Sequence, residues 1–275
     1  MRAAAVQLNS TEDKDRNLAT TERLVRAAAA DGADLVVLPE KFNVLGTHEH
    51  YEAGAEPLDG RTIGWARELA RELGLDLVAG SIVERREGHD KLANTSVHLG
   101  PDGELRGVYR KIHMFDVTVE GKEYRESTSQ EAGEEIVTSE AEGARLGLTI
   151  CYDLRFPELY RILSIQGARI LIVPAAFTKH TGQAHWDTLL RARAIENQAF
   201  VVAADQIGVH PPDNESFGGS QIIDPWGEVL VRAEDSESYV VADLDLARQD
   251  EVRETLPSLA NRVPSAYRWP QEAGV

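Results

Sequence analysis

Residues 144–158 read Ala-Arg-Leu-Gly-Leu-Thr-Ile-Cys-Tyr-Asp-Leu-Arg-Phe-Pro-Glu, and the interpretation of the whole chain starts from this stretch. Its first part predicts a buried β-strand, and an apolar pattern of helical period follows Pro157. Cys151, the only cysteine of the chain, therefore lies at a strand-to-helix turn. The carboxyl ends of strands are where α/β folds build sites, and free N–H groups at a helix start favour a thiolate. A buried structural thiol is the alternative, and position alone does not decide between the two.

The size and composition of the chain restrict its class. It has 275 residues, 42% of them hydrophobic, and no Pro/Gly/Ser-rich linker between Arg2 and about Val252, so we expect a single domain over residues 1–275. The net charge of −17 repels phosphate backbones and anionic lipid surfaces, which argues against nucleic acid and membranes as partners. A single cysteine suits a reducing compartment, and the first residues are too short an apolar run for a signal peptide. We expect a soluble, cytoplasmic protein.

Strand and helix patterns alternate along the chain. In the first half we expect a helix between Ser10 and Gly32, a helix over 62–73, and strands at 2–8, 34–39, 77–83, 95–99 and 105–109. In the second half we expect helices at 157–166 and 184–197, and strands at 170–174, 200–204, 220–223, 228–232 and 239–244. The acidic, polar stretch 118–135 is expected to be a functional or mobile loop. This alternation predicts mixed sheets covered by helices.

Three of these strands end on a polar residue with a chemical use. Glu40 follows one strand, Lys111 follows another, and Cys151 follows the third. If neighbouring strands bring these ends together, the carboxylate can take the thiol proton and the thiolate can attack an amide carbon. The ammonium and a backbone N–H can then stabilise the oxyanion. Each residue alone has a plainer explanation, such as an acid at a helix start for Glu40 or a solvated surface charge for Lys111.

These segments resemble the three signature motifs of the nitrilase superfamily of carbon–nitrogen hydrolases. The resemblance rests on Leu-Pro-Glu at 38–40, Tyr-Arg-Lys-Ile-His at 109–113 and Ile-Cys-Tyr-Asp-Leu-Arg-Phe-Pro-Glu-Leu at 150–159, and it continues through 184–186, 191–197 and 224–228. It implies an α/β fold, a four-layer α-β-β-α sandwich of two mixed sheets. It also implies Glu40 as general base, Lys111 as oxyanion stabiliser and Cys151 as nucleophile.

The resemblance implies further site residues. Members of this family often carry a second glutamate after the lysine motif, and Glu126 matches that place best. Glu120 and Glu123 stay open, because the acidic loop between the motifs varies in length among relatives. The N–H of Tyr152 is expected to complete the oxyanion hole, and His113 is expected to pack beside the lysine rather than to act as a base.

The residues after the cysteine indicate a branch of the family. Cys-Tyr-Asp stands where true nitrilases usually have Cys-Trp-Glu, and it resembles the amidase branch that acts on ω-amides of keto acids and on deaminated glutathione. The resemblance thus implies cleavage of an amide C–N bond in a small carboxylate-bearing substrate, through a thioester, with release of ammonia or an amine. N-carbamoyl amino acid amidohydrolase and nitrilase activities are the alternatives. Arg155 resembles a residue that binds substrate carboxylate in the carbamoylase branch, and an ion pair with Glu158 is the structural alternative.

Other functions have weaker support in the sequence. A Cys-His-Glu glutaminase generally uses a Gly-x-Cys-x-Gly elbow, and no glycine flanks Cys151. A catalytically inactive interaction protein on the same fold predicts loss of a member of the triad, and all three members are present. No cofactor is expected, because the glycine-rich segments lack a phosphate-loop pattern. No metal is expected either, because the spacing of the histidines, among them His180, His185 and His210, matches no metal-ligand pattern.

The resemblance also bears on partners. Family members associate through helices on one face, so a homodimer or higher homo-oligomer is expected. Residues 257–275 are polar, proline-rich and aperiodic, which fits a C-terminal arm that reaches over a partner subunit. A small amide is the other expected partner.

Overall fold

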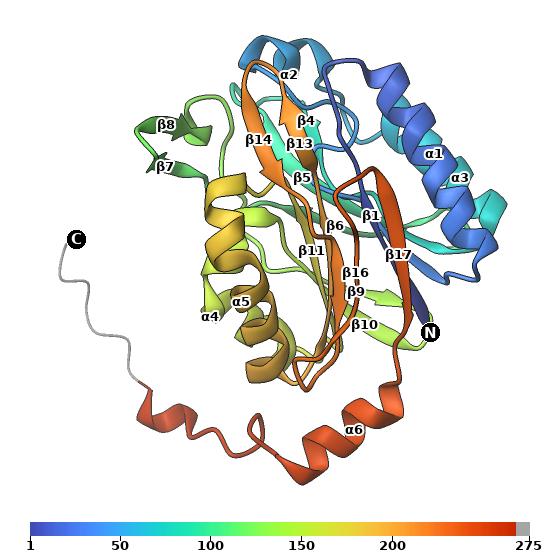
Figure 1. The fold of residues 1–275 in the computed structure, drawn as a ribbon, viewed down its shortest axis with the longest axis vertical. Helices are drawn as coiled ribbons and strands as arrows, with labels where there is room; N and C mark the ends of the chain where they lie inside the picture. The colour runs from blue at the N-terminus through green and yellow to red at the C-terminus, as the bar shows by residue number, and fades with distance from the viewer. Residues whose placement is uncertain (268–275) are drawn as a thin grey trace.

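The fold consists of two β-sheets stacked face to face between two pairs of helices. The computed structural model describes residues 1–267. Figure 1 shows α1 (Lys14–Ala30) and α3 (Arg61–Leu73) on one outer side, and α4 (Pro157–Ile165) and α5 (Lys179–Asn197) on the other. The expected four-layer α-β-β-α sandwich is confirmed.

Both sheets mix parallel and antiparallel strands. The first sheet has the order β17-β1-β2-β3-β5-β4, with β6 paired to β5, and its strands are β1 (Arg2–Gln7), β2 (Leu35–Val37), β3 (Asp76–Val78), β4 (Ile82–Glu84), β5 (Ala93–Leu99), β6 (Leu105–Arg110) and β17 (Ser238–Asp243). The second sheet has the order β16-β15-β12-β11-β10-β9, and its strands are β9 (Thr138–Ala141), β10 (Ala144–Leu148), β11 (Ile170–Ala175), β12 (Phe200–Asp205), β15 (Gln221–Ile223) and β16 (Val229–Arg232). Strands β1 to β3 run parallel, as do β10 to β12, so their carboxyl ends share an edge within each sheet.

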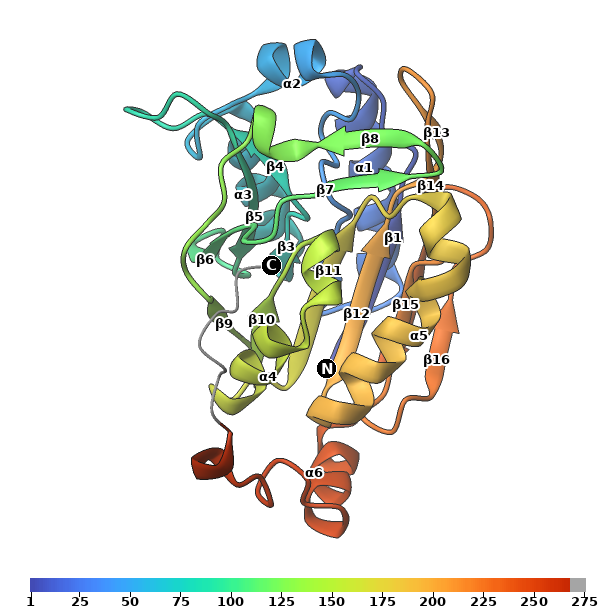
Figure 2. The same ribbon diagram turned by 90° about the vertical axis from the view of Figure 1, so that its left-hand side faces the viewer.

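Shorter elements gather at one end of the sandwich. They are α2 (His48–Gly54), the hairpin of β7 (Asp116–Val119) with β8 (Lys122–Arg125), and the hairpin of β13 (Ile207–His210) with β14 (Asn214–Phe217). Figure 2 shows these three elements at the top of the molecule, whereas α6 (Leu246–Thr255) lies at the bottom. None of the helices within residues 1–267 has the length and apolar character needed to cross a membrane.

The alternation of side chains along β1 separates two apolar layers. Ala3 and Ala5 pack toward the second sheet and join the buried residues of β10, β11 and β12. Ala4 and Val6 point the other way and pack with the buried faces of α1 and α3. Because consecutive side chains of a strand alternate between faces, a strand covered on both sides is apolar on both, as residues 3–6 of β1 are. Full burial of each valine or leucine in such layers contributes roughly 1.5–3 kcal/mol.

The structure corrects several expected elements. The strand expected at 77–83 is two strands, β3 and β4, because Gly80 turns the chain with φ of 34°. Gly80 also lies so close to the Pro39 carbonyl oxygen that a Cβ would not fit. The polar stretch 118–135, expected as a loop, contributes to the β7–β8 hairpin and contains a 3-10 turn over Glu126–Thr128. The sequence patterns did not predict α2, α6, β9 or the β13–β14 hairpin.

The C-terminal segment is described only in part. Residues 257–267 follow α6 and include a 3-10 turn over Pro264–Ala266, and most of their side chains are exposed. Residues 268–275, the end of the expected arm, lie outside the described part. The single domain over residues 1–275 stays a prediction.

Candidate active site

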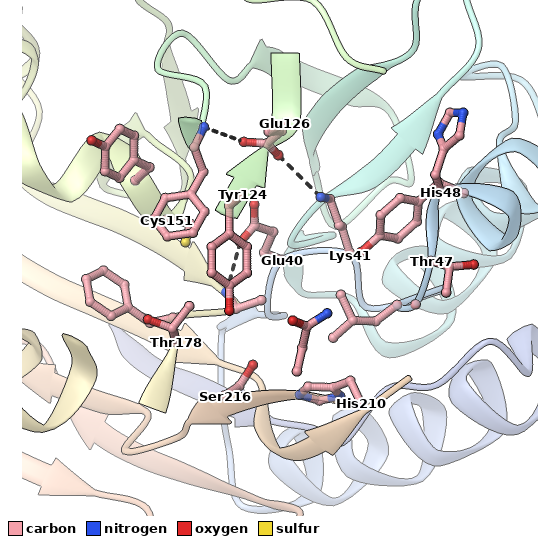
Figure 3. Close-up of a pocket in the computed structure, with 18 of the residues that line it drawn as sticks. Glu40, Lys41, Thr47, His48, Tyr124, Glu126, Cys151, Thr178, His210 and Ser216 are labelled. Atoms are coloured by element: carbon pink, nitrogen blue, oxygen red, sulfur yellow. Dashed lines mark hydrogen bonds and ion pairs between the residues drawn. The ribbon is translucent and has the colours of Figure 1, made fainter. Parts of the chain in front are cut away.

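Four charged or reactive side chains, from the two large sheets and from the segment after the β7–β8 hairpin, meet near the carboxyl ends of the parallel strands. Glu40 lies three residues after β2, Lys111 directly follows β6, and Cys151 lies three residues after β10. Glu126 opens the 3-10 turn after β8. All four side chains are largely buried, and Figure 3 shows Glu40, Glu126 and Cys151 around one cavity. The structure therefore brings together the three strand ends and the second glutamate named from the sequence.

Glu40 is held by three donors. Its Oε1 accepts hydrogen bonds from Asn94 Nδ2 at 2.7 Å and from Lys111 Nζ at 3.1 Å. Its Oε2 accepts the backbone N–H of Ala176, in the second sheet's layer, at 2.9 Å. These contacts hold the carboxylate in one orientation between the two sheets.

Lys111 lies between two carboxylates. Its Nζ donates to Glu126 Oε2 at 2.8 Å as well as to Glu40 at 3.1 Å. Burial alone would lower the pKa of Lys111, but the carboxylates of Glu126 and Glu40 hold that pKa well above its ordinary value. The lysine is therefore an ammonium at neutral pH, the form that can stabilise an oxyanion.

Of the three glutamates that the sequence left open, only Glu126 lies in this cluster. It accepts the backbone N–H of Phe115 at 2.9 Å in addition to Lys111. Burial raises its pKa, but Lys111 and Lys41 outweigh burial and keep the pKa below the ordinary value. Glu120 is exposed and pairs with His180 at 3.1 Å, and the exposed Glu123 pairs with Arg125 at the cavity rim.

The turn that carries Cys151 is braced by one buried carboxylate. Cys151 has a left-handed backbone, φ 49°, at the start of a 3-10 turn over Cys151–Arg155. Asp153 Oδ2 accepts the backbone N–H of Ile150 at 2.8 Å and the hydroxyl of Tyr109 at 2.7 Å. Its Oδ1 accepts the backbone N–H of His113 at 3.2 Å and lies 2.7 Å from His113 Nδ1. His113 thus belongs to the support of the turn, and its ring stacks on Phe156 with centroids 3.5 Å apart.

The thiol of Cys151 is neutral at rest. Burial raises its pKa, and so does Glu40, whereas Lys111 and the N–H of Ala176 lower it, and the net pKa lies well above the ordinary value. The expectation that a following helix would hold a thiolate is wrong here, because a 3-10 turn follows the cysteine and α4 begins only at Pro157. Ionisation of the thiol must therefore accompany transfer of its proton to a neighbouring base.

The cavity beside the thiol holds about 430 Å³. Tyr152 lines it next to Cys151, and its ring packs edge-on against Phe115 and Phe156. Arg155 is not one of the lining residues. Its guanidinium lies 5.1 Å from the ring centroid of Phe177, 5.9 Å from that of Tyr152, and 3.3 Å from His185 Nδ1. The structure therefore does not bring Arg155 to the cavity wall.

Three contributors were missed by the sequence interpretation. Asn94 donates to Glu40, Asp153 braces the turn of Cys151, and Lys41 lines the cavity with its ammonium 3.3 Å from Glu126. A polar residue inside the fully buried strand β5 was a signal for Asn94, since such a group needs a partner. Within residues 1–267 no group of three or more His, Cys, Asp or Glu side chains is arranged to hold a metal ion.

Comparison with known proteins agrees with this geometry. The profile of the Carbon-nitrogen hydrolase family matches residues 2–254. Deaminated glutathione amidase of Synechocystis is 40% identical over 95% of this chain and 97% of its own length. Omega-amidase NIT2 of Homo sapiens is 38% identical over 97% of this chain and 96% of its own length. The NitFhit protein of C. elegans superposes with a TM-score of 0.90 at 36% identity, over 97% of this chain and 66% of that longer chain.

These matches cover nearly all of the chain, and they agree with the motifs and with the sandwich. The protein belongs to the carbon–nitrogen hydrolase family, within the nitrilase superfamily.

Proposed function

We propose that this protein is an amidase that cleaves the C–N bond of a small carboxylate-bearing amide through a thioester on Cys151. The names of its relatives favour an ω-amide or a substrate of the deaminated glutathione type. One observation carries the proposal: Lys111 joins Glu40 and Glu126 at 3.1 and 2.8 Å beside a buried, neutral thiol. This arrangement supplies a base, a cation and a nucleophile whose side chains are buried next to one another.

In the first step, Glu40 takes the proton of the Cys151 thiol while the sulfur attacks the amide carbon. A C–S bond forms, and the carbonyl electron pair moves to oxygen. Because the thiol has a raised pKa, proton transfer and attack belong together, and no free thiolate has to accumulate.

The oxyanion then needs donors. The Lys111 ammonium supplies a charge, and the backbone N–H of Tyr152 at the start of the 3-10 turn supplies a dipole. Loss of one such donor typically raises the barrier by about 2.7–4 kcal/mol. Glu126 keeps Lys111 in place through the bond at 2.8 Å and acts as a positioning residue.

The tetrahedral intermediate collapses when the C–N bond breaks and Glu40 returns its proton to the leaving nitrogen. Ammonia or an amine departs, and the acyl group stays on sulfur as a thioester. Water then attacks the thioester carbon while Glu40 takes a proton from it. The C–S bond breaks, the acid product leaves, and the sulfur recovers its proton from Glu40, which completes the cycle.

N-carbamoyl amino acid amidohydrolase and nitrilase activities are alternatives that use the same three side chains. A catalytically inactive interaction protein on this fold is the non-enzyme alternative. The amide assignment has more support, because the two curated relatives named above are amidases.

A substrate screen with ammonia as readout tests the proposal. It includes ω-amides, deaminated glutathione, N-carbamoyl acids and nitriles, with Cys151→Ala protein as the matched control, and a separate assay for released amines. We expect turnover of an ω-amide or of deaminated glutathione, and an acyl adduct on the Cys151 peptide after acid quenching. Turnover by the Cys151→Ala protein, or no turnover of any amide by the wild-type protein, would contradict the proposal.

We also propose a homodimer or higher homo-oligomer in the cytoplasm, with neither nucleic acid nor membrane as partner. Exposed apolar side chains on the outer helices and in the C-terminal segment support self-association: Ile162, Ile165, Ile195, Leu256, Val263 and Tyr267. The net charge of −17 supports the absence of nucleic-acid and membrane partners, and the single cysteine supports the cytoplasmic location.

A further inference from the structure

Lys41 is a cavity residue that the proposed chemistry does not use. It directly follows Glu40, yet both side chains are buried and both line the cavity. In an extended strand, consecutive side chains point to opposite faces, so this pair needs a break in the alternation. The break is the left-handed backbone of Lys41, φ 52°, whose N–H donates to Ser81 Oγ at 2.9 Å. Such strain in a residue other than glycine persists mainly at functional sites.

The ammonium of Lys41 has two partners and room for a third. Its Nζ lies 3.3 Å from Glu126 Oε1 and 4.6 Å from the ring centroid of Tyr51. Within residues 1–267 it makes no other hydrogen bond, and its side chain is 10% exposed. Burial would lower the pKa of Lys41, but Tyr51, Glu126 and Glu40 outweigh burial and raise the pKa above its ordinary value. The residue is therefore a fixed cation with a free N–H at the cavity.

Lys41 and the nucleophile lie at different ends of the site. Figure 3 shows Cys151 on one side of Glu126 and Lys41 on the other. The two oxygens of Glu126 hold the two ammonium groups, Lys111 at 2.8 Å and Lys41 at 3.3 Å. An amide whose oxygen meets Lys111 can therefore extend past Glu126, so that its far end reaches Lys41.

Lys122 and Arg125 also line the cavity, and each is paired with an acid. Lys122 pairs with Asp213 at 2.6 Å and is 40% exposed, and Arg125 pairs with Glu123 at the rim. The guanidinium of Arg155 lies over Phe177, and the residue does not line the cavity. An exposed, paired cation contributes little to the binding of an anion.

We infer that Lys41 binds the carboxylate of the substrate, and that it selects amides with an anionic end several atoms from the amide carbon. This inference rests on the proposed function. The two ammonium groups and the two carboxylates alternate in space, and a substrate carboxylate on the cavity side of Lys41 would extend this row of opposite charges. The net charge of −17 repels an anion at long range, and a buried cation supplies the local attraction that binding requires.

The test compares glutaramate, a five-carbon ω-amide with a free carboxylate, with its methyl ester. We measure kcat/KM for both substrates in wild-type protein, in Lys41→Met and in Arg155→Ala, with the exposed Lys179→Met as matched control. In Lys41→Met the ratio of kcat/KM for acid over ester should fall about 10- to 100-fold, mainly through KM. The ratio should stay within about threefold of wild type in the other two variants, and Lys41→Arg should restore part of it.

Several outcomes would overturn the inference. An unchanged ratio in Lys41→Met does so, and so does a large fall in Arg155→Ala, which would move the carboxylate site to Arg155. Turnover of neither amide by wild-type protein counts instead against the proposed function. Calorimetry of glutaramate binding to Cys151→Ala protein, with and without Lys41→Met, covers the case of a variant that no longer turns over. Equal affinity of those two proteins also overturns the inference.

Discussion

The ammonium of Lys111 lies 2.8 Å from Glu126 Oε2, closer than the 3.1 Å to Glu40 Oε1. Burial disfavours both charges of the Lys111–Glu126 pair, yet each keeps the other ionised. The pKa of Lys111 is raised and that of Glu126 is lowered, so neither group titrates near neutral pH. Glu126 therefore sets where the positive charge of Lys111 is held.

Glu126→Gln should lower kcat about 10- to 100-fold, because one charge-assisted hydrogen bond to Lys111 becomes a neutral one. It should also lower the free energy of unfolding, since the buried ammonium groups of Lys111 and Lys41 each lose one charged partner. Glu123→Gln, at the exposed rim, is the control. Steady-state kinetics and thermal unfolding measure both effects, and normal turnover by Glu126→Gln would show that Lys111 needs no second carboxylate.

Lys111→Met should lower kcat by about two to three powers of ten while the chain still folds, because an oxyanion donor is lost. Lys111→Arg should also fail, since a planar fork cannot take the place of a compact ammonium between two carboxylates. Circular dichroism verifies that each variant is folded, and steady-state kinetics then measure its kcat. A near-normal kcat in either variant would show that Lys111 does not stabilise the oxyanion.

Glu40→Gln should separate thiol reactivity from catalysis. Because Glu40 raises the pKa of the Cys151 thiol, its removal should lower that pKa and increase the thiolate fraction at a given pH. Iodoacetamide should therefore label the variant faster than wild type at pH 7–8, whereas amide turnover should vanish. In the wild type the labelling rate should rise only at alkaline pH. Cys151 is the only cysteine, so the mass of the whole protein reports the reaction; slower labelling of the variant would contradict the raised pKa.

Asp153→Asn should loosen the nucleophile turn. The carboxylate accepts from Ile150, Tyr109 and His113, and an amide nitrogen in place of one oxygen would face a donor. We expect a loss of about 1–3 kcal/mol in the free energy of unfolding, together with a fall in kcat. Urea unfolding measures the first, and Asp250→Asn, at an exposed ion pair, is the control. If the two variants had equal free energies of unfolding, Asp153 would not stabilise the turn of Cys151.

Light scattering should give a mass above the 30.3 kDa of one chain at micromolar concentration. Ile165→Glu, on α4 where the side chain is 54% exposed, should shift the protein toward the monomer because a charge at this apolar position opposes its burial in an interface. Leu230→Glu, on β16, is the control and should leave the mass unchanged. A wild-type mass near 30.3 kDa at all concentrations would contradict self-association.

The fold and the central residues could be predicted because their signals are local. The strands before Glu40 and Cys151 are visible as apolar runs followed by a polar residue, whereas Lys111 follows a strand of mixed composition in which only Tyr109 is buried. The family resemblance then supplied the layers, which periodicity alone does not. The strand order β17-β1-β2-β3-β5-β4 had no local signal, since pairing partners lie far apart in the chain.

The parts that escaped prediction depend on tertiary contacts. Lys41 was passed over because a charged residue after a strand is ordinarily solvated, and only the left-handed backbone turns it inward. The position of Arg155 could not be predicted either. Its guanidinium lies over the rings of Phe177 and Tyr152, and Phe177 comes from the segment after β11, far away in the sequence. The β7–β8 hairpin has a polar composition that fits a loop equally well, and it forms over the cavity where it finds partners such as Asp213.

The pairing of β1 with β17 has a consequence for biosynthesis. Arg2 lies opposite Asp243 in an antiparallel register, so β1 is synthesised long before β17, its partner at the edge of the first sheet. Until β17 is made, β1 can pair only with β2, and its other edge stays open to wrong partners. Completion of the first sheet is therefore a late event, and the high sequence separation of this contact predicts slow final closure. A nascent chain stalled before residue 238 should bind chaperones and lack amidase activity, even though Glu40, Lys111, Glu126 and Cys151 have all been synthesised.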